Sequence, residues 1–162
     1  MTFKPYLLLC LLLLSNLAVA KHEQYCNGRF DYCVAIPDSV VISPIEPQNG
    51  DGRLFGVKGT DAIIVAYGSL WPSVIGASDE ELLQEKQQSV CEQAQCRITY
   101  QVKKDNYYIA SGYYLDDDKI FYQVYRLKNG EEHHLDFTYS KKHKAKMDKI
   151  ISQMVSSFLK DD

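Results

Sequence analysis

The sequence lacks most of the patterns that would assign a chemistry to it. It has no Gly-x-Ser-x-Gly, no His-Glu-x-x-His and no glycine-rich phosphate-binding loop, which argues against the common hydrolase, metalloprotease and nucleotide-binding classes. With 18 Lys and Arg against 21 Asp and Glu, it also lacks the positive excess of a nucleic-acid-binding protein. Beyond residue 20 no apolar run reaches the length of a transmembrane helix. We therefore expect a protein that is not an enzyme, needs no cofactor and does not bind nucleic acid.

Residues 1–20 have the organisation of a cleavable secretory signal peptide. Lys4 precedes a leucine-rich run, and Ala18-Val19-Ala20 matches a small-x-small cleavage site. Cys10 follows Leu9, where a lipoprotein signal requires a small residue, so no lipid anchor is expected. Loss of Lys4 on cleavage would change the formal net charge from −3 to −4. The sequence thus predicts a soluble protein in a periplasm or outside the cell.

The cysteines that follow the signal peptide are Cys26, Cys33, Cys91 and Cys96. An even number in an exported chain predicts two disulfides, for which three connectivities exist. We favour Cys26–Cys33, with the chain reversing direction at Asn27-Gly28. We also favour Cys91–Cys96, which requires a helix to end between the two residues, because in a continuous helix their side chains would point about 140° apart. Zinc ligation and a redox pair are the alternatives. The six residues between Cys26 and Cys33 fit the Cys-x₂₋₄-Cys spacing of zinc sites poorly, and the Cys-x-x-Cys of a redox pair is absent. Each short closure should contribute roughly 2–2.5 kcal/mol.

The patterning beyond the signal peptide predicts an α+β fold. Extended pieces are expected around 34–36 and 40–42 and a buried strand at 61–67. A capping box beginning at Ser78 should start a helix that runs to about Ala94 and buries a thin apolar face. An antiparallel β-meander follows, with expected strands at 97–104, 107–115, 119–127 and 133–139.

A C-terminal amphipathic helix closes the chain, and its apolar stripe should pack on one face of the meander. The stripe consists of Met147, Ile150, Ile151, Met154, Val155 and Phe158. We divide the chain into a signal peptide (1–20), a disulfide-stapled and turn-rich leader (21–60) and an α+β core (61–162) that forms a single globular domain with the leader.

The order of these elements resembles the PsbP-like family. The resemblance covers roughly residues 61–159 and rests on element order, on the aromatic stretch KIFYQVYRLKNGEEHHLDFTYSKK and on a final helix ending in MVSSFL. The fold is shared by extrinsic photosystem II subunits, a Ran-binding nuclear protein and periplasmic proteins of the DcrB type. The resemblance implies a binding or accessory protein and carries no catalytic motif.

Tyrosine is unusually frequent, with 12 in the chain and most of them in the meander. Because one sheet face should be covered by the last helix, we expect the opposite face to carry rings suited to an interface. The candidate binding surface comprises Tyr107, Tyr113, Tyr122, Tyr125, Arg126 and His133. The alternative is that tyrosine simply favours strands and covers a sheet face that is partly exposed to solvent.

No metal site is expected. His133 and His134 are neighbours on a strand and should point to opposite faces. The segments NGDG (49–52) and DDD (116–118) lack the ligand set of a calcium loop and are better explained as turns. The lysines of 141–149 indicate either a solvated helix face or an anionic partner.

These patterns favour an exported, soluble accessory protein of the bacterial envelope whose partner is another envelope or secreted protein. An immunity-type inhibitor of a periplasm-targeted toxin is the first alternative, and its gene should adjoin a toxin gene. A small hydrolase whose nucleophile and base meet only in space is the second.

Overall fold

A computed structural model describes residues 23–92 and 95–160 of the chain. The expected signal peptide, and Ala94 at the expected end of the first helix, lie outside the described residues. Within the described part, no helix is both long enough and apolar enough to span a membrane.

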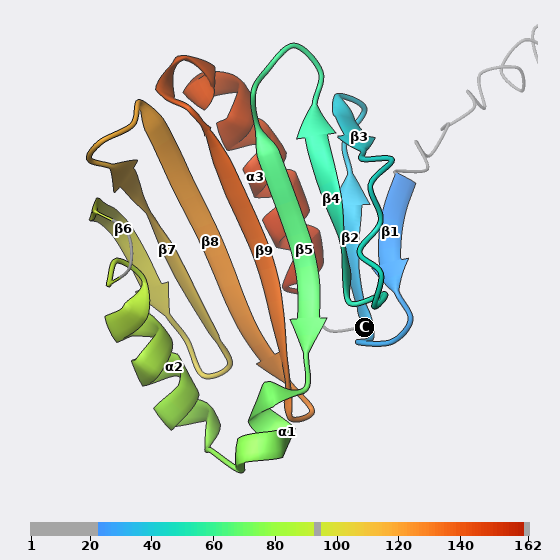
Figure 1. Cartoon of the computed structure of the whole chain (residues 1–162), viewed down its shortest axis with the longest axis vertical. Helices are drawn as coiled ribbons and strands as arrows, with labels where there is room; N and C mark the ends of the chain where they lie inside the picture. The colour runs from blue at the N-terminus through green and yellow to red at the C-terminus, as the bar shows by residue number, and fades with distance from the viewer. Residues whose placement is uncertain (1–22, 93–94, 161–162) are drawn as a thin grey trace, which may run out of the picture.

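The described residues form a two-stranded hairpin, a seven-stranded antiparallel sheet and three α-helices (Figure 1). The hairpin strands are Glu23–Asn27 (β1) and Tyr32–Ile36 (β2). The sheet strands are Val40–Ile42 (β3), Gly52–Val57 (β4), Ile63–Ser69 (β5), Cys96–Lys103 (β6), Tyr107–Tyr114 (β7), Lys119–Lys128 (β8) and Glu131–Ser140 (β9). The helices are Trp71–Ile75 (α1), Asp79–Ser89 (α2) and Lys144–Phe158 (α3), with a 3₁₀ turn at Lys141–His143 (η1).

The sheet order is β3-β4-β5-β9-β8-β7-β6, so the second half of the sheet is the predicted four-strand meander. The connection from β5 to β6 contains α1 and α2 and carries the chain from the middle of the sheet to its far edge (Figure 1). Asn129 and Gly130 both have positive φ and join β8 to β9 directly, as the Asn-Gly signal predicts.

The two faces of the sheet carry separate hydrophobic clusters. On one face, α3 and the β1–β2 hairpin pack over β4, β5, β8 and β9, and all six residues of the predicted apolar stripe are buried there. On the other face, α2 packs over β7 and β8 through Leu82 and Leu83. Figure 1 shows α3 behind the sheet and α2 in front of it, whereas no helix crosses the front of β4 and β5.

The predicted α+β fold is confirmed, and so is the capping box at the start of α2. The Ser78 hydroxyl accepts a hydrogen bond from the Glu81 N–H, and the Glu81 carboxylate accepts one from the Ser78 N–H at 2.9 Å. The helix ends at Ser89, earlier than expected, so both Cys91 and Cys96 follow it.

Three elements were not predicted: β1, β4 and α1. Because β4 pairs with β5, and β3 pairs with β4, residues on both sides of the expected boundary at residue 60 belong to one sheet. The leader instead contributes Phe30, Tyr32, Val34 and Ile36 to the same buried cluster as α3.

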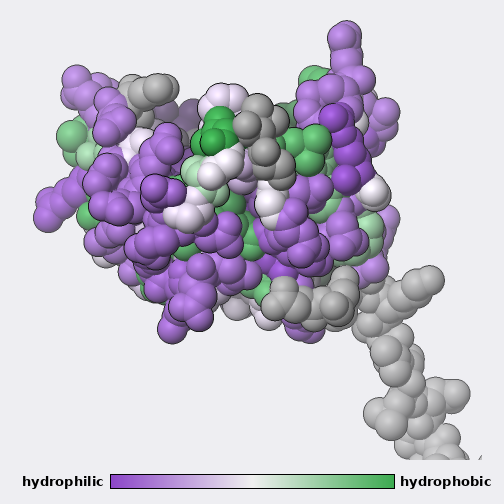
Figure 2. Space-filling view, turned by 90° about the horizontal axis from the view of Figure 1, so that it is seen from below, coloured by the Kyte–Doolittle hydropathy of each residue, from purple (hydrophilic) through white to green (hydrophobic). Residues whose placement is uncertain are grey.

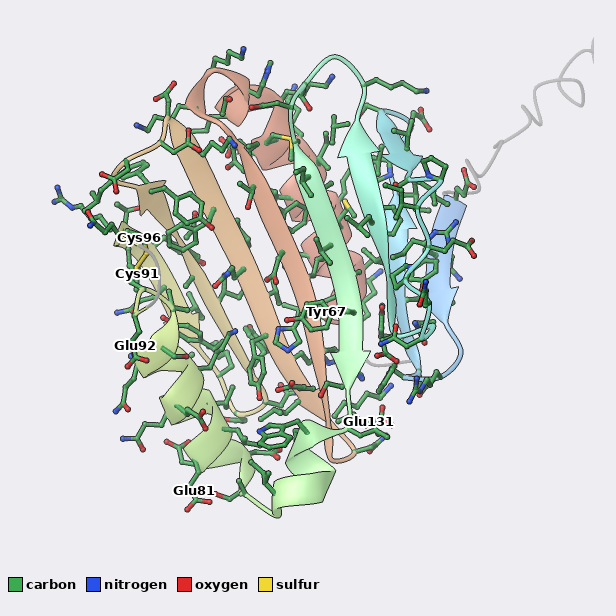
Figure 3. All side chains as sticks on the ribbon, in the orientation of Figure 1. Tyr67, Glu81, Cys91, Glu92, Cys96 and Glu131 are labelled. Carbon is green, nitrogen blue, oxygen red and sulfur yellow. A yellow bond between two sulfur atoms is a disulfide. The ribbon has the colours of Figure 1, made fainter. Side chains whose placement is uncertain are left out.

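Both expected disulfides are formed. Cys26 and Cys33 are directly opposed across β1 and β2, and Cys91–Cys96 links the end of α2 to the start of β6 (Figure 3). The β1–β2 reversal differs from the expectation, because its positive φ is at Asp31 and not at Gly28. The buried Asn27 side chain holds this turn, accepting the N–H groups of Arg29 and Phe30 at 2.9 and 3.2 Å.

Candidate functional site: a tyrosine groove

Five of the six predicted surface residues share one face of the sheet, and three of these are tyrosines. Tyr107 and Tyr122 pack against the cluster beneath α3, and Tyr113 lies beside Tyr122 in a groove near the start of that helix. Every second side chain along a strand points to the same face, so Tyr107 and Tyr113 of β7 share a face. Their cross-strand partners on β8 are Arg126 and Ile120, and Tyr122 is two residues from Ile120 on that same face.

The groove has a volume of about 330 Å³ and is formed where α3 leaves the β6 and β7 end of the sheet uncovered. Its tyrosines come from four strands and are Tyr100, Tyr113, Tyr122 and Tyr139. Tyr100 and Tyr113 are 49% and 38% exposed, and Tyr139 forms a buried floor. We name this site the tyrosine groove.

The rings of the groove hold one another in place. The Tyr100 and Tyr122 rings are stacked with centroids 6.5 Å apart, and the Lys141 ammonium lies 5.5 Å from the Tyr113 ring centroid. Burial raises the pKa of Tyr122 to about 12, and burial together with nearby Asp148 raises the pKa of Tyr139 to about 12. Both phenols therefore remain neutral and can donate hydrogen bonds to a ligand.

The predicted location of this surface was wrong. We expected the tyrosines on the face opposite the last helix, but the groove lies on the same face as α3, beside the start of that helix. Tyr125 does lie on the opposite face, where it is 3% exposed and packs in the cluster beneath α2. It therefore does not contribute to the groove.

Arg126 and His133 are structural residues, and their placement on an exposed surface was also wrong. The Arg126 side chain is 2% exposed and donates to the Phe158 carbonyl at 2.8 Å, at the end of α3. His133 is fully buried against Tyr32, with ring centroids 5.3 Å apart. Burial lowers the pKa of His133, and the charge of Arg126 lowers it further, although Glu131 opposes the shift.

Two members of the groove, Tyr100 and Tyr139, were not among the predicted site residues. Tyr139 can be placed in the groove only from its pairing with Ile120, so its assignment requires the β8–β9 register. Tyr100 follows a bulge in β6, which shifts the alternation of side chains between the two faces, and the sequence does not predict the bulge.

Two of the five lysines in residues 141–149 form salt bridges, and a third, Lys146, donates to the Lys58 carbonyl. Lys144 contacts Asp148 at 2.7 Å, and Lys141 contacts Asp118 at 3.1 Å. These contacts favour an ordinary solvated helix face. His133 and His134 point to opposite faces of β9, as expected, and among residues 23–92 and 95–160 no three His, Cys, Asp or Glu side chains are grouped to hold a metal ion.

Comparison with known proteins gives a structural match only. No family model and no curated protein sequence matches the chain. The solution structure of cyanobacterial PsbP (CyanoP) from Synechocystis sp. PCC 6803 superposes with a TM-score of 0.59 at 13% identity, covering 88% of this chain and 94% of that one. This chain has a PsbP-like fold. A protein of unknown function from Pseudomonas aeruginosa superposes with a TM-score of 0.46 at 10% identity over 82% of this chain and 95% of that one, a likeness that supports no inference.

Proposed function

We propose that this protein is an exported, non-enzymatic accessory protein that binds a segment of another envelope or secreted protein in the tyrosine groove. The observation that carries the proposal is the clustering of four tyrosines from four strands around an open groove beside α3. Tyrosine rings lose little conformational entropy on binding and offer both an apolar face and a hydroxyl, which is why interfaces are enriched in them.

The volume of the groove, about 330 Å³, is at the lower end of the roughly 300–1,000 Å³ usual for small-molecule cavities, but such cavities enclose most of their ligand. The groove is open, with two of its rings more than one-third exposed. A protein segment that inserts an apolar or aromatic side chain between Tyr100 and Tyr113 fits this shape better than an enclosed small molecule does.

The contacts of Ser69 support a non-enzymatic role. Its hydroxyl accepts the Trp71 N–H at 3.0 Å and is hydrogen-bonded to Glu132. Within the described part of the chain, it makes no hydrogen bond to His134, the one imidazole near it on that face. A serine hydrolase requires such a contact between nucleophile and base.

Site-specific photo-crosslinking tests the binding role. A photoreactive phenylalanine at position 113 should capture a defined protein in envelope extract, and Tyr100→Ala should reduce that product at least several-fold. The same probe at the exposed Leu115, outside the groove, is the matched control. Equal products from positions 113 and 115, or none from either, would rule out the groove as the binding site.

Export is tested separately by the mass of the mature protein. We expect the purified chain to begin at Lys21 and to be recovered from the periplasm or medium. A chain that retains residues 1–20 would contradict the export part of the proposal and leave the groove experiment unaffected.

A further inference from the structure

A second cavity lies on the opposite face of the sheet, away from the tyrosine groove. It has a volume of about 200 Å³ and is bounded by α1 and α2 on one side and by β8 and β9 on the other. Its sheet wall consists of Tyr125, Glu132 and His134, and Trp71, Glu85 and Lys86 come from the helices. Seen from the α1 end, hydrophobic residues gather in the middle of this end of the molecule and hydrophilic residues surround them (Figure 2).

The acidic group in this cavity is held in a fixed position. Glu132 is hydrogen-bonded to Tyr125 and to Ser69, and its side chain is only 17% exposed. Although burial opposes ionisation, these bonds and nearby His134 lower the pKa of Glu132, so the carboxylate is charged at neutral pH. A fixed, half-buried carboxylate attracts a cation more strongly than a solvated one does.

His134 supplies an unsatisfied polar group in the same wall. It is 5% exposed, its Nδ1 has no hydrogen-bond partner in the described part of the chain, and its Nε2 lies 3.5 Å from a Glu132 oxygen, at the limit of a hydrogen bond. Buried polar side chains normally have partners. The stacked Tyr67 ring, whose position Figure 3 shows in the middle of the open sheet face, fixes the imidazole plane.

The chain places one cation of its own in this cavity. The Lys86 ammonium lies 5.5 Å from the Tyr125 ring centroid, within the range of a cation–π contact. Lys86 is half-buried on the side of α2 that faces the sheet, and among the described residues it forms no salt bridge to a carboxylate. The cavity thus already accommodates an alkylammonium group next to an aromatic face.

We propose that this cavity binds a single ammonium or guanidinium group, with Glu132 as the counter-ion, the Tyr125 ring as the aromatic face and the His134 imidazole as an acceptor. A volume of about 200 Å³ accommodates one such group and its alkyl stem. Lys86 occupies the cavity in the free protein and competes with the ligand. The group comes either from a free amine or from a Lys or Arg side chain of a protein.

Trp71 is the one tryptophan of the chain and lines the cavity, so its fluorescence reports on binding directly. Agmatine and acetyl-arginine methylamide are the two cationic probes, and n-butanol and butyrate are the neutral and anionic controls at equal ionic strength. We expect a saturable change in Trp71 emission with the cations and none with the controls. Tighter binding of the blocked arginine identifies a protein side chain as the source, and tighter binding of agmatine identifies a free amine.

Two variants with opposite expected effects separate binding from a structural role. Glu132→Gln should weaken agmatine binding about tenfold or more, because it removes the counter-ion. Lys86→Gln should strengthen binding on the order of threefold to tenfold, because it removes the internal competitor. A general loss of structure would weaken binding in both variants and cannot produce this pattern.

The matched controls carry the same charge changes outside the cavity. Glu92→Gln at the end of α2 and Lys104→Gln after β6 should leave agmatine affinity unchanged, since both residues are exposed and neither lines the cavity. Equal responses to agmatine and n-butanol, or a Lys86→Gln variant that binds agmatine no more tightly than the unmodified protein, would overturn the proposal.

Discussion

The phenol ring of Tyr67 stacks on the imidazole of His134, with centroids 4.1 Å apart and planes 4° from parallel. The two residues are direct partners across β5 and β9, so the sheet register brings the rings together. Burial raises the pKa of Tyr67, and nearby Asp136 and Glu132 raise it further, so the ring stays neutral. The polar face of the sheet is thus organised around β9, whose residues 132, 134 and 136 all point to the same side.

Asp136, the third of these residues, should make stability depend on pH. Burial raises its pKa above the ordinary 3.8, although His134 and Lys86 oppose this effect. Between 3.8 and the raised pKa, the folded chain holds a proton that the unfolded chain has lost, so stability falls as pH rises through that window. Asp136→Asn removes the penalty. Its unfolding free energy at pH 7, measured in urea, should exceed that of the unmodified chain by more than the roughly 0.5 kcal/mol that a neutral surface substitution can cause.

The pH dependence separates this effect from a general change in packing. At pH 3 the advantage of Asp136→Asn should disappear, since the carboxyl is then protonated in both states. The exposed Asp105→Asn is the control and should leave stability unchanged at both pH values. If Asp136→Asn is less stable than the unmodified chain at pH 7, the carboxylate is paired and its charged form stabilises the fold.

Gly68 should not tolerate a side chain, because Phe30 of the hairpin turn lies directly against it. A Cβ at this position would lie 2.3 Å from Phe30 Cγ, and Phe30 is 2% exposed. Gly68→Ala should therefore lower the unfolding free energy by about 1–3 kcal/mol. Gly28→Ala has open space around the new Cβ and no positive φ, and thermal unfolding should show a change within about 0.5 kcal/mol. Similar losses in both variants would mean that the hairpin does not pack on β5.

Sequence patterns predicted the elements that depend on residues close together in the chain. The capping box at Ser78, the Asn129-Gly130 turn and the six-residue stripe of α3 each depend on residues close in sequence, and all three are confirmed. Strand β4 was missed because its sequence, GRLFGV, contains two glycines, and it forms because β3 and β5 pair with it on both sides.

The candidate site was predicted less well than the fold, because its composition depends on which strands each helix covers. Periodicity places Tyr113 and Tyr122 on a face but does not show that α3 stops short of β6 and β7. Arg126 and His133 looked accessible because charged and polar residues usually are. Both are buried because the end of α3 and the β1–β2 hairpin, distant in sequence, pack over them.

The two disulfides should stabilise the fold by similar and independent amounts. Replacing both cysteines of either pair with serine should lower the unfolding free energy by about 2–2.5 kcal/mol, because each bridge closes a short loop of comparable length in the unfolded chain. Chemical denaturation of the two double-serine variants and of the quadruple variant measures this. The losses should add, since the Cys26–Cys33 bridge lies in the β1–β2 hairpin and Cys91–Cys96 packs against the cluster beneath α2, and dithiothreitol should affect the quadruple variant least.

Arg126 should be required for the end of α3, because its guanidinium donates to the carbonyls of Phe158 and Lys160 at 2.8 and 3.3 Å. The last carbonyls of a helix lack partners within the helix, and burial makes an unmet acceptor costly. Arg126→Met should lower the unfolding free energy by about 2–4 kcal/mol and speed amide exchange in the last turn of α3. The exposed Arg97→Met on β6 should change stability by less than about 0.5 kcal/mol. If Arg126→Met is as stable as Arg97→Met, the guanidinium is dispensable for the fold, and the residue is again a candidate for binding.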